Sequence, residues 1–276
     1  MIKQAIIPLA GIGSRMLPLS SVIPKELLPI NGRIGLEYIL DECIASGIKE
    51  IILIISNKKM MIKKYFNNDV FFKKIIKKKK DKYLISEYKK IQKYKKIIKF
   101  VYQNKPLGTG DAVLKTKKFI TDKYFLMLLP DDLIINKNCS KSMISVHNKY
   151  KSSVMASMNV KKKDVSRWGI YDVKKKLSNS NFVIKSVIEK PARNKAPSNK
   201  AVIGRYILPK TIFKKLSKQK KGKAGEIHIT DAIQSLINEN YKFIGHNFAG
   251  KYLDCGTMNG YIKSSLNISK IWKFAW

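Results

Sequence analysis

Apolar residues in the first fifty-five positions follow the pattern of a strand, a helix and a second strand. Residues 4–10 form a short apolar run that ends at a loop with two glycines, and residues 50–55 form a continuous apolar run. Between them, apolar residues recur at helical spacing over 34–46, and Gly47 stands where such a helix would end. A continuous apolar strand is typical of a parallel sheet buried on both faces. This opening therefore predicts an open α/β sheet with ligands at the carboxyl ends of its strands.

Further apolar runs continue this pattern along the chain. They predict strands over 101–103, 124–129, 153–158 and 182–189, a helix over 111–118, and another helix that Thr230 caps. The segment 58–99 is very rich in lysine and predicts surface helices with solvated charges. No internal repeat and no long linker divides the chain, so residues 1–276 are expected to form a single domain.

The formal net charge of +37 places nucleic-acid binding among the functions to consider. Only five of the 56 basic residues are arginine, the residue that forks onto bases and phosphates; they stand at positions 15, 33, 167, 193 and 205. Lysine is instead scattered through every region together with isoleucine and asparagine, which indicates a genome rich in A and T. The sequence therefore predicts no specific nucleic-acid partner, and a basic RNA-binding protein stays open as the non-enzyme alternative.

The expected compartment follows from three features of the sequence. No apolar run approaches the roughly 18 residues that span a bilayer, and the N-terminus lacks the pattern of a secretory signal. Cys43, Cys139 and Cys255 lie far apart without metal-ligand spacing, which is typical of free thiols in a reducing compartment. We therefore expect a cytoplasmic protein with no membrane partner.

Two loops near the N-terminus carry residues suited to phosphate binding. The loop LAGIGSRMLP holds Gly11 and Gly13, where the backbone could pass close to a phosphate with its amide hydrogens as donors, and Arg15 adds charge. The loop is neither a Walker A motif nor a full dinucleotide fingerprint, so taken alone an ordinary tight turn explains it equally well. The segment IPKELLP then places Lys25 between two prolines, where a lysine could reach the same phosphates.

Acidic residues stand at three points further along the chain. Asp131 ends an apolar run in the sequence LPDD, and Asp254 lies in the sequence DCGT. Mg²⁺ prefers one or two carboxylates with phosphate oxygens and water, so both aspartates suit it; turn or cap residues are the ordinary alternative. In VIEKP, Glu189 could accept from sugar hydroxyls while Lys190 holds a phosphate, and a surface turn is again the alternative.

The order of these motifs resembles that of one family. GIGSRMLP, IPKELLP, a glutamine before GTG, LPDD, VIEKP, APSNKAVIGRY, EIHITDAI and DCGT follow one another within residues 3–265. This order resembles the bacterial sugar nucleotidyltransferases, and the segments at 43–55, 196–208 and 226–233 are similar to the uridylyltransferase branch. The resemblance implies a Rossmann-like mixed, mostly parallel sheet flanked by helices. It also implies transfer of UMP from UTP to glucose 1-phosphate, giving UDP-glucose and pyrophosphate.

The resemblance further implies roles for individual residues. Those that would surround the UTP are Ala10, Gly11, Gly13, Ser14 and Arg15, with Lys25 reaching its phosphates. Gln103 and Gly108 would read the uracil edge, and Gly169, Glu189 and Lys190 would take the glucose 1-phosphate. Asp131 and Asp254 would hold Mg²⁺, while Arg15, Lys25 and Lys190 would supply the fixed positive charge of catalysis.

Some positions depart from the family pattern. Ser14 replaces the usual threonine, Asp111 stands beside the expected base pocket where the uridylyl branch usually has histidine, and Gly225 stands where an acidic residue often precedes EI. Thymine differs from uracil by one methyl group, so a glucose-1-phosphate thymidylyltransferase is the nearest alternative. Because members of the family are often dimers or tetramers, the resemblance also implies a homo-oligomer.

Overall fold

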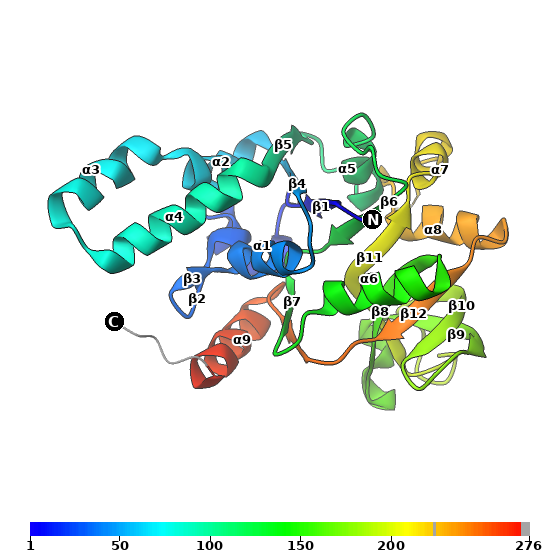
Figure 1. The fold of residues 1–276 in the computed structure, drawn as a ribbon. Helices are drawn as coiled ribbons and strands as arrows, with labels where there is room; N and C mark the ends of the chain where they lie inside the picture. The colour runs from blue at the N-terminus through cyan, green and yellow to red at the C-terminus, as the bar shows by residue number, and fades with distance from the viewer. Residues whose placement is uncertain (223–224, 272–276) are drawn as a thin grey trace.

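Within residues 1–222 and 225–271, the part of the chain that the computed structural model describes, a nine-stranded mixed sheet forms the centre of the molecule (Figure 1). Its strands are β1 (Gln4–Pro8), β4 (Glu50–Ile55), β5 (Ile98–Tyr102), β6 (Tyr124–Leu128), β8 (Ser153–Asn159), β9 (Gly169–Lys176), β10 (Asn181–Glu189), β11 (Lys200–Pro209) and β12 (Phe243–Asn247). Their order across the sheet is β5-β4-β1-β6-β11-β8-β12-β10-β9.

The sheet has a parallel half and a half in which antiparallel pairs prevail. β5, β4, β1 and β6 run parallel to one another, and β12 runs parallel to β8. β11 joins the halves through antiparallel pairs with β6 and β8, and β10 pairs antiparallel with β12 and β9. The predicted α/β class with a mixed sheet is confirmed. The carboxyl ends of the four neighbouring parallel strands share one edge of the sheet.

Helices cover both faces of the sheet. On one face, α1 (Gly35–Ala45) and α6 (Cys139–Tyr150) bury side chains such as Leu40 and Met143. On the other face, α5 (Thr109–Lys115), α7 (Ile212–Lys218) and α8 (Ile229–Asn238) bury side chains such as Val113 and Phe213. Successive residues of β1 belong alternately to the two cores on either face of the sheet, as expected for a strand buried on both faces.

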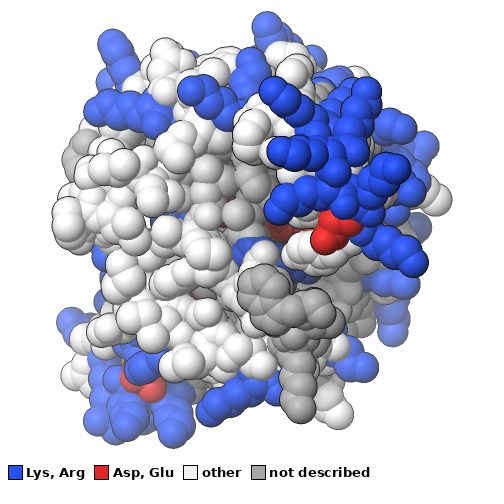
Figure 2. Space-filling view, turned by 90° about the vertical axis from the view of Figure 1, so that its left-hand side faces the viewer, with Lys and Arg blue, Asp and Glu red and all other residues white. Residues whose placement is uncertain are grey.

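The lysine-rich segment forms helices at one end of the molecule, as predicted. These are α2 (Met60–Asn67), α3 (Asp69–Lys79) and α4 (Lys82–Ile97), and Figure 1 shows α3 and α4 extending away from the sheet. On the face drawn in Figure 2, lysine and arginine side chains gather in separate regions with few acidic side chains among them. In the described part of the chain, no helix has both the length and the apolarity that crossing a bilayer requires.

Two small sheets lie outside the large one. β7 (Asp132–Ile135) pairs with β13 (Lys251–Asp254), and β2 (Pro29–Ile30) pairs with β3 (Arg33–Ile34). Helix α9 (Met258–Ile271) follows β13 and packs against it. The β7–β13 pair joins two segments that lie far apart in the sequence.

Two helices begin at other residues than the sequence predicts. α5 begins two residues early, at Thr109. α8 begins at Ile229, with His228 in an extended conformation at its N-cap, so the prediction that Thr230 caps this helix is wrong. The reason lies in the preceding segment, which is held against another loop by backbone hydrogen bonds and leaves the helix to begin directly after it.

Candidate active site

The candidate site lies at the edge where the four parallel strands end. The loop after β1 emerges there, together with Gln103 directly after β5 and Asp131 shortly after β6. Open α/β sheets bind their ligands outside the carboxyl ends of the strands. Asp131 lines two of the cavities that open at this edge in the described part of the chain.

The first cavity, of about 380 Å³, lies between the loop after β1 and the loop before α5. Lys25 and Asp131 line it together with every residue predicted to bind the nucleotide other than Arg15, namely Ala10, Gly11, Gly13, Ser14, Gln103 and Gly108. The structure thus brings these residues together from three separate segments of the chain. Their roles toward a nucleotide stay predictions.

The loop after β1 keeps its backbone open toward the first cavity. Gly13 has a φ of +74°, in the left-handed region that side chains disfavour, and its carbonyl oxygen accepts a hydrogen bond from Ser20 Oγ at 2.8 Å. A side chain at Gly11 would meet no protein atom within 4 Å. The shape of the loop therefore requires glycine at 13, whereas glycine at 11 leaves space that a ligand can fill.

A buried ion pair anchors the short helical turn Lys25–Leu27. Lys59 Nζ lies 2.8 Å and 2.9 Å from the two carboxylate oxygens of Glu26, and both side chains are almost fully buried. Burial lowers the pKa of Lys59, although the Glu26 carboxylate opposes this shift. The anchored turn presents Lys25, whose Nζ donates to Asp131 Oδ2 at 2.7 Å.

The loop before α5 is shaped by the backbone of Ile227. Gly110 N donates to Ile227 O at 2.7 Å, and Ile227 N donates to Leu107 O at 2.8 Å. A Cβ at Gly108, whose φ is +94°, would lie 2.6 Å from Ile227 O. Glycine at 108 is therefore required by a close approach of two backbones. The motif EIHITDAI supplies this approach, and the residues on both sides of Ile227 line the first cavity.

Gln103 is buried at the end of β5, with its amide nitrogen held by two acceptors. Nε2 donates to Gly108 O at 3.0 Å and to Asp111 Oδ2 at 2.8 Å. Asp111, which departs from the family pattern, is buried in the first turn of α5. Asp111 is not among the residues that line the first cavity, so it lies behind Gln103 as seen from the cavity.

The second cavity, of about 360 Å³, lies on the other side of Asp131. Gly169 and Glu189, both predicted to bind the sugar phosphate, line it from the paired strands β9 and β10. Lys190 follows β10 with a φ of +45°, and its side chain is 64% exposed. Arg15 lines this second cavity, so the structure places it on the side opposite the predicted nucleotide site.

The small sheet β7–β13 brings Asp131 and Asp254 together although 123 positions separate them (254 − 131). Its register places Asp254 opposite Asp132, and Cys255 N donates to Asp131 O at 2.8 Å. A Cβ placed on Gly256 would lie 2.7 Å from Asp131 Oδ2 and 3.2 Å from Asp254 Oδ1. The two carboxylate oxygens therefore lie near each other beside Gly256, with Arg15 Nη2 2.8 Å from the same Cβ position and Gly256 N donating to Asp254 Oδ1 at 2.8 Å. A pair of carboxylates suits Mg²⁺.

The two adjacent aspartates of LPDD have opposite electrostatic environments. Burial would raise the pKa of Asp131, but the Lys25 ammonium outweighs it with help from Arg15 at 3.3 Å, so this pKa lies below its usual range. Burial and the charge of Asp131 raise the pKa of Asp132 to about 6. Asp132 accepts a hydrogen bond from the Tyr252 hydroxyl at 2.6 Å. Asp131 is thus the ionised group between the cavities, whereas Asp132 ties β7 to β13.

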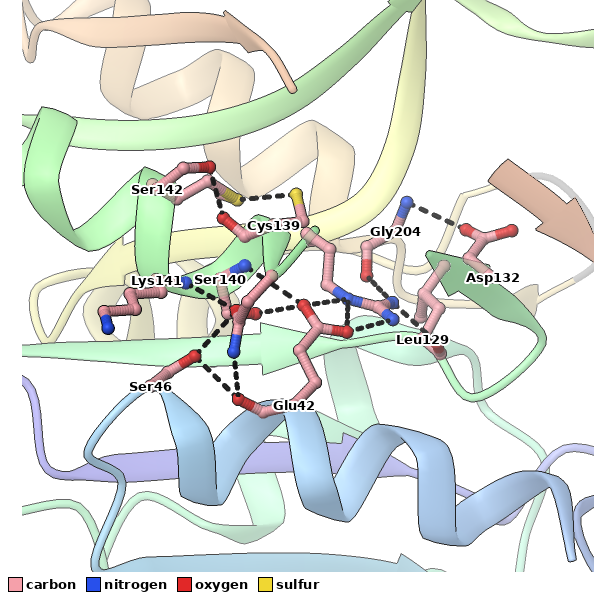
Figure 3. A network of polar contacts seen from close by, with 12 residues as sticks. Glu42, Ser46, Leu129, Asp132, Cys139, Ser140, Lys141, Ser142 and Gly204 are labelled. Atoms are coloured by element: carbon pink, nitrogen blue, oxygen red, sulfur yellow. Dashed lines mark hydrogen bonds and ion pairs between the residues drawn. The ribbon is translucent and has the colours of Figure 1, made fainter. Parts of the chain in front are cut away.

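A buried network fixes the end of β6 from behind (Figure 3). Arg205 on β11 is fully buried, and its Nη2 lies 2.8 Å from Glu42 Oε2 on α1. Ser140, at the start of α6, donates to the same carboxylate through its backbone and its hydroxyl. Arg205 Nη1 donates to Leu129 O at 3.0 Å. Because Leu129 lies two residues before Asp131, this network holds the segment that carries Asp131.

Comparison with known proteins decides the family. The model of the family described as "Nucleotidyl transferase" matches residues 4–271, nearly the whole chain. The chain belongs to this family. The resemblance found in the order of the sequence motifs is confirmed.

Individual nucleotidyl transferases match along almost their full length. UTP–glucose-1-phosphate uridylyltransferase 2 of Streptococcus pyogenes is 34% identical over 278 residues, covering 96% of this chain and 90% of the relative. UTP–glucose-1-phosphate uridylyltransferase of Bacillus subtilis is 33% identical over 269 residues, covering 97% and 91%. The structure of a UTP-bound UGPase from Acinetobacter baumannii superimposes with a TM-score of 0.90 at 32% identity, covering 99% and 95%.

Several residues of this nucleotidyl transferase's site have no assigned role in the sequence analysis. Lys59 and Ile227 shape the first cavity, and Arg167 and Tyr252 line the second. The motif EIHITDAI marked Ile227 as part of the family pattern. The sequence distinguishes Arg167 only as one of five arginines in a lysine-rich chain. No sequence feature distinguishes Lys59 from the other lysines.

Proposed function

We propose that this nucleotidyl transferase transfers UMP from UTP to glucose 1-phosphate, giving UDP-glucose and pyrophosphate. The observation that carries the proposal is the position of Asp131 between two cavities. One is lined by the two glycine-bearing loops and suits a nucleotide, and the other is lined by β9 and β10 and suits a sugar phosphate. Relatives named UTP–glucose-1-phosphate uridylyltransferase support UTP and glucose 1-phosphate as the pair.

The chemistry needs alignment and charge neutralisation, and no covalent enzyme intermediate. An anionic phosphate oxygen of glucose 1-phosphate attacks the α-phosphorus of UTP. As this P–O bond forms, the bond from the α-phosphorus to the bridging oxygen breaks, and pyrophosphate leaves with the electron pair. Catalysis of this type comes from positioning the two anions in line and stabilising the charge between them.

The two cavities divide the substrates between them. In the first, the backbone around Gly11 and Gly13 approaches the triphosphate, Ala10 and Ser14 complete the loop, Lys25 supplies charge, and Gln103 with Gly108 reads the uracil edge. In the second, Gly169 and Glu189 accommodate the glucose, and Lys190, next to Glu189 in the chain but not among the lining residues, holds its phosphate. Arg15 reaches Asp131 from the second side and supplies positive charge where the two phosphates meet.

Asp131 and Asp254 are the proposed ligands of one Mg²⁺ ion. Their carboxylate oxygens lie near each other beside Gly256, and among the described residues no cluster of three or more Asp, Glu, His or Cys surrounds them. The remaining ligands would be phosphate oxygens and water, as Mg²⁺ prefers. When bound, the ion would neutralise charge between the two polyanions. Lys25 keeps the Asp131 carboxylate ionised for this role.

Release of pyrophosphate tests the proposal directly. Purified protein is supplied with glucose 1-phosphate, Mg²⁺ and each nucleoside triphosphate in turn, and UTP is expected to support the fastest release. If none of the triphosphates supported release of pyrophosphate, the proposed reaction would be overturned. If dTTP were used about tenfold faster than UTP, a barrier difference of about 1.4 kcal/mol, the enzyme would be a thymidylyltransferase.

The high positive charge acts on substrate capture in this proposal. Lysines spread over the surface raise the local concentration of anionic substrates, an effect that fades with salt (Figure 2). The same charge attracts nucleic acid without regard to sequence. A filter-binding titration at about 0.15 M salt should show no preferred RNA or DNA sequence, and a strong preference would favour the RNA-binding alternative.

We also propose a homo-oligomer, which light scattering of the purified protein tests.

A further inference from the structure

The orientation of the Gln103 amide is set by its surroundings. Its nitrogen lies 2.8 Å from Asp111 Oδ2 and 3.0 Å from Gly108 O. A carboxylate and a backbone carbonyl are acceptors without a proton to donate, so only the NH₂ group of the amide can face them. Lys115 Nζ, at 3.7 Å from Asp111 Oδ1, accompanies the acidic side chain. The chemistry of these neighbours therefore fixes which end of the amide points away from them.

The other end of the amide is left for the ligand. Gln103 lines the first cavity, whereas Asp111 lies behind it. Within residues 1–222 and 225–271, Gln103 Oε1 accepts no hydrogen bond, and the backbone N–H of Gly108 donates none. Among the described residues, Gln103 Oε1 is therefore an unused acceptor and the Gly108 N–H an unused donor, and both residues line the first cavity. Uracil presents a donor at its ring N3–H beside carbonyl acceptors, whereas cytosine presents a lone pair at N3.

We propose that Asp111 is a positioning residue that holds Gln103 as a hydrogen-bond acceptor toward the base and so makes the enzyme select uracil over cytosine. The proposal rests on the proposed function, because it assumes that the first cavity holds the base. Asp111 acts through Gln103 by accepting a hydrogen bond from its NH₂ group. The end of the amide that faces the base is then Oε1, which can accept a hydrogen bond but cannot donate one. Rejection of CTP follows because Oε1 and the cytosine N3 would face each other as an unpaired pair of acceptors.

Substitutions at position 111 separate positioning from structural support. Asp111→Leu removes the acceptor at similar volume, and Asp111→Ala is a second variant with less risk to packing. Either change leaves the Gly108 carbonyl oxygen as the one remaining acceptor of the two that hold the Gln103 NH₂ group, so the amide is held less firmly in this orientation. The ratio of kcat/KM for UTP to that for CTP should therefore fall by about tenfold, as expected when a buried hydrogen bond is left unmade. Asp111→Asn keeps an acceptor for the NH₂ group and should restore most of the ratio. Lys115→Ala, on the same helix, should leave the ratio unchanged.

A double variant tests whether the effect passes through Gln103. In a Gln103→Leu background, Asp111→Ala should cause no further change in the UTP-to-CTP ratio. Equal losses with UTP and CTP in Asp111→Leu and Asp111→Ala would overturn the positioning role and leave only structural support. Equilibrium binding of UTP and CTP to each variant gives the same ratio without turnover. If the wild-type enzyme releases no pyrophosphate but still binds UTP in preference to CTP, the proposed reaction fails while the role of Asp111 stands.

Discussion

The two cavities that meet at Asp131 differ in how far the protein has ordered their walls. In the first, the side chains of Gln103 and Lys25 are largely buried, and each is held by hydrogen bonds. In the second, the side chain of Glu189 is 68% exposed, and the side chain of Lys190, the next residue along the chain, is 64% exposed with Nζ 3.9 Å from Glu189 Oε1. An exposed pair at this distance contributes little to stability. The residues predicted to bind the nucleotide are therefore held by protein contacts, whereas Glu189 and Lys190, predicted to bind the sugar phosphate, are held less firmly.

The largest expected effect concerns the buried pair Arg205–Glu42, which holds the segment that carries Asp131. Arg205→Leu leaves the Glu42 carboxylate buried without its partner, so the free energy of unfolding should fall by about 3–5 kcal/mol. Replacing both residues by leucine should cost less than Arg205→Leu alone, because no unpaired charge remains. Urea unfolding followed by circular dichroism measures both changes. On the exposed side, Lys190→Ala should change the free energy of unfolding by less than about 0.5 kcal/mol; a loss as large as that of Arg205→Leu would remove the contrast between the cavities.

The next effect concerns the carboxylates between the cavities. Asp131→Asn and Asp254→Asn should each lower the rate of UDP-glucose formation by roughly a hundredfold or more, because a neutral amide is a poor ligand for Mg²⁺. The double variant should be scarcely slower than either single variant, since the two residues act as one unit. Initial rates at saturating substrate measure this, with thermal unfolding as the check on folding. Near-normal activity in Asp254→Asn would leave Asp131 as the sole protein ligand.

A smaller effect is expected at Lys190, next to Glu189 on the sugar side. Lys190→Ala should raise the requirement for glucose 1-phosphate and leave that for UTP nearly unchanged, because the proposed role of the lysine is to contact the sugar phosphate alone. Loss of one charge-assisted contact should cost on the order of 1.5–3 kcal/mol in kcat/KM. Varying each substrate in turn gives the two KM values. A raised KM for UTP alone would place Lys190 on the other phosphate.

The smallest effect tests the open space at Gly11. Gly11→Ala adds a methyl group that meets no protein atom, so the midpoint of thermal unfolding should stay unchanged while the KM for UTP rises roughly fivefold. Gly13→Ala is the matched control, because its positive φ should lower stability by about 1–2 kcal/mol before any ligand binds. An unchanged KM in Gly11→Ala would mean that the triphosphate does not pass over this residue.

The sequence predicts the elements whose pattern is local and uniform. β4 was predicted with its observed bounds because all its residues but the first are apolar and buried. β9 was not predicted, because it ends in exposed lysines that give it no apolar run. β13 was not predicted either, since a strand of four residues is too short for a periodic signal. Short or half-exposed strands are formed by pairing with distant partners, and the sequence carries little local trace of them. The long, buried strand β11 was not predicted either, because Gly204 and Arg205 interrupt its apolar run.

The candidate site divides in the same way. Gly13 and Asp131 were found because they stand in motifs that follow apolar strands. Their supports were not found: Lys59 is one lysine among many, and Ile227 acts through its backbone, which any residue possesses. Arg205 lies within the motif APSNKAVIGRY, yet only the structure shows that it donates a hydrogen bond to Leu129 O. Sequence patterns identify residues that would touch a ligand more readily than residues that hold them in place.

The pairing of β7 with β13 has a consequence for how the enzyme comes into being on the ribosome. Chains are made from the N-terminus, and earlier segments can fold before later ones emerge. The loop after β1 and Asp131 are synthesised well before Asp254, which lies 123 positions further along the chain (254 − 131). A nascent chain that ends between His228 and Asp254 would thus carry every segment that lines the first cavity, with one of the two proposed metal ligands missing. Catalytic competence would arrive late in translation, when the strand that carries Asp254 has left the exit tunnel.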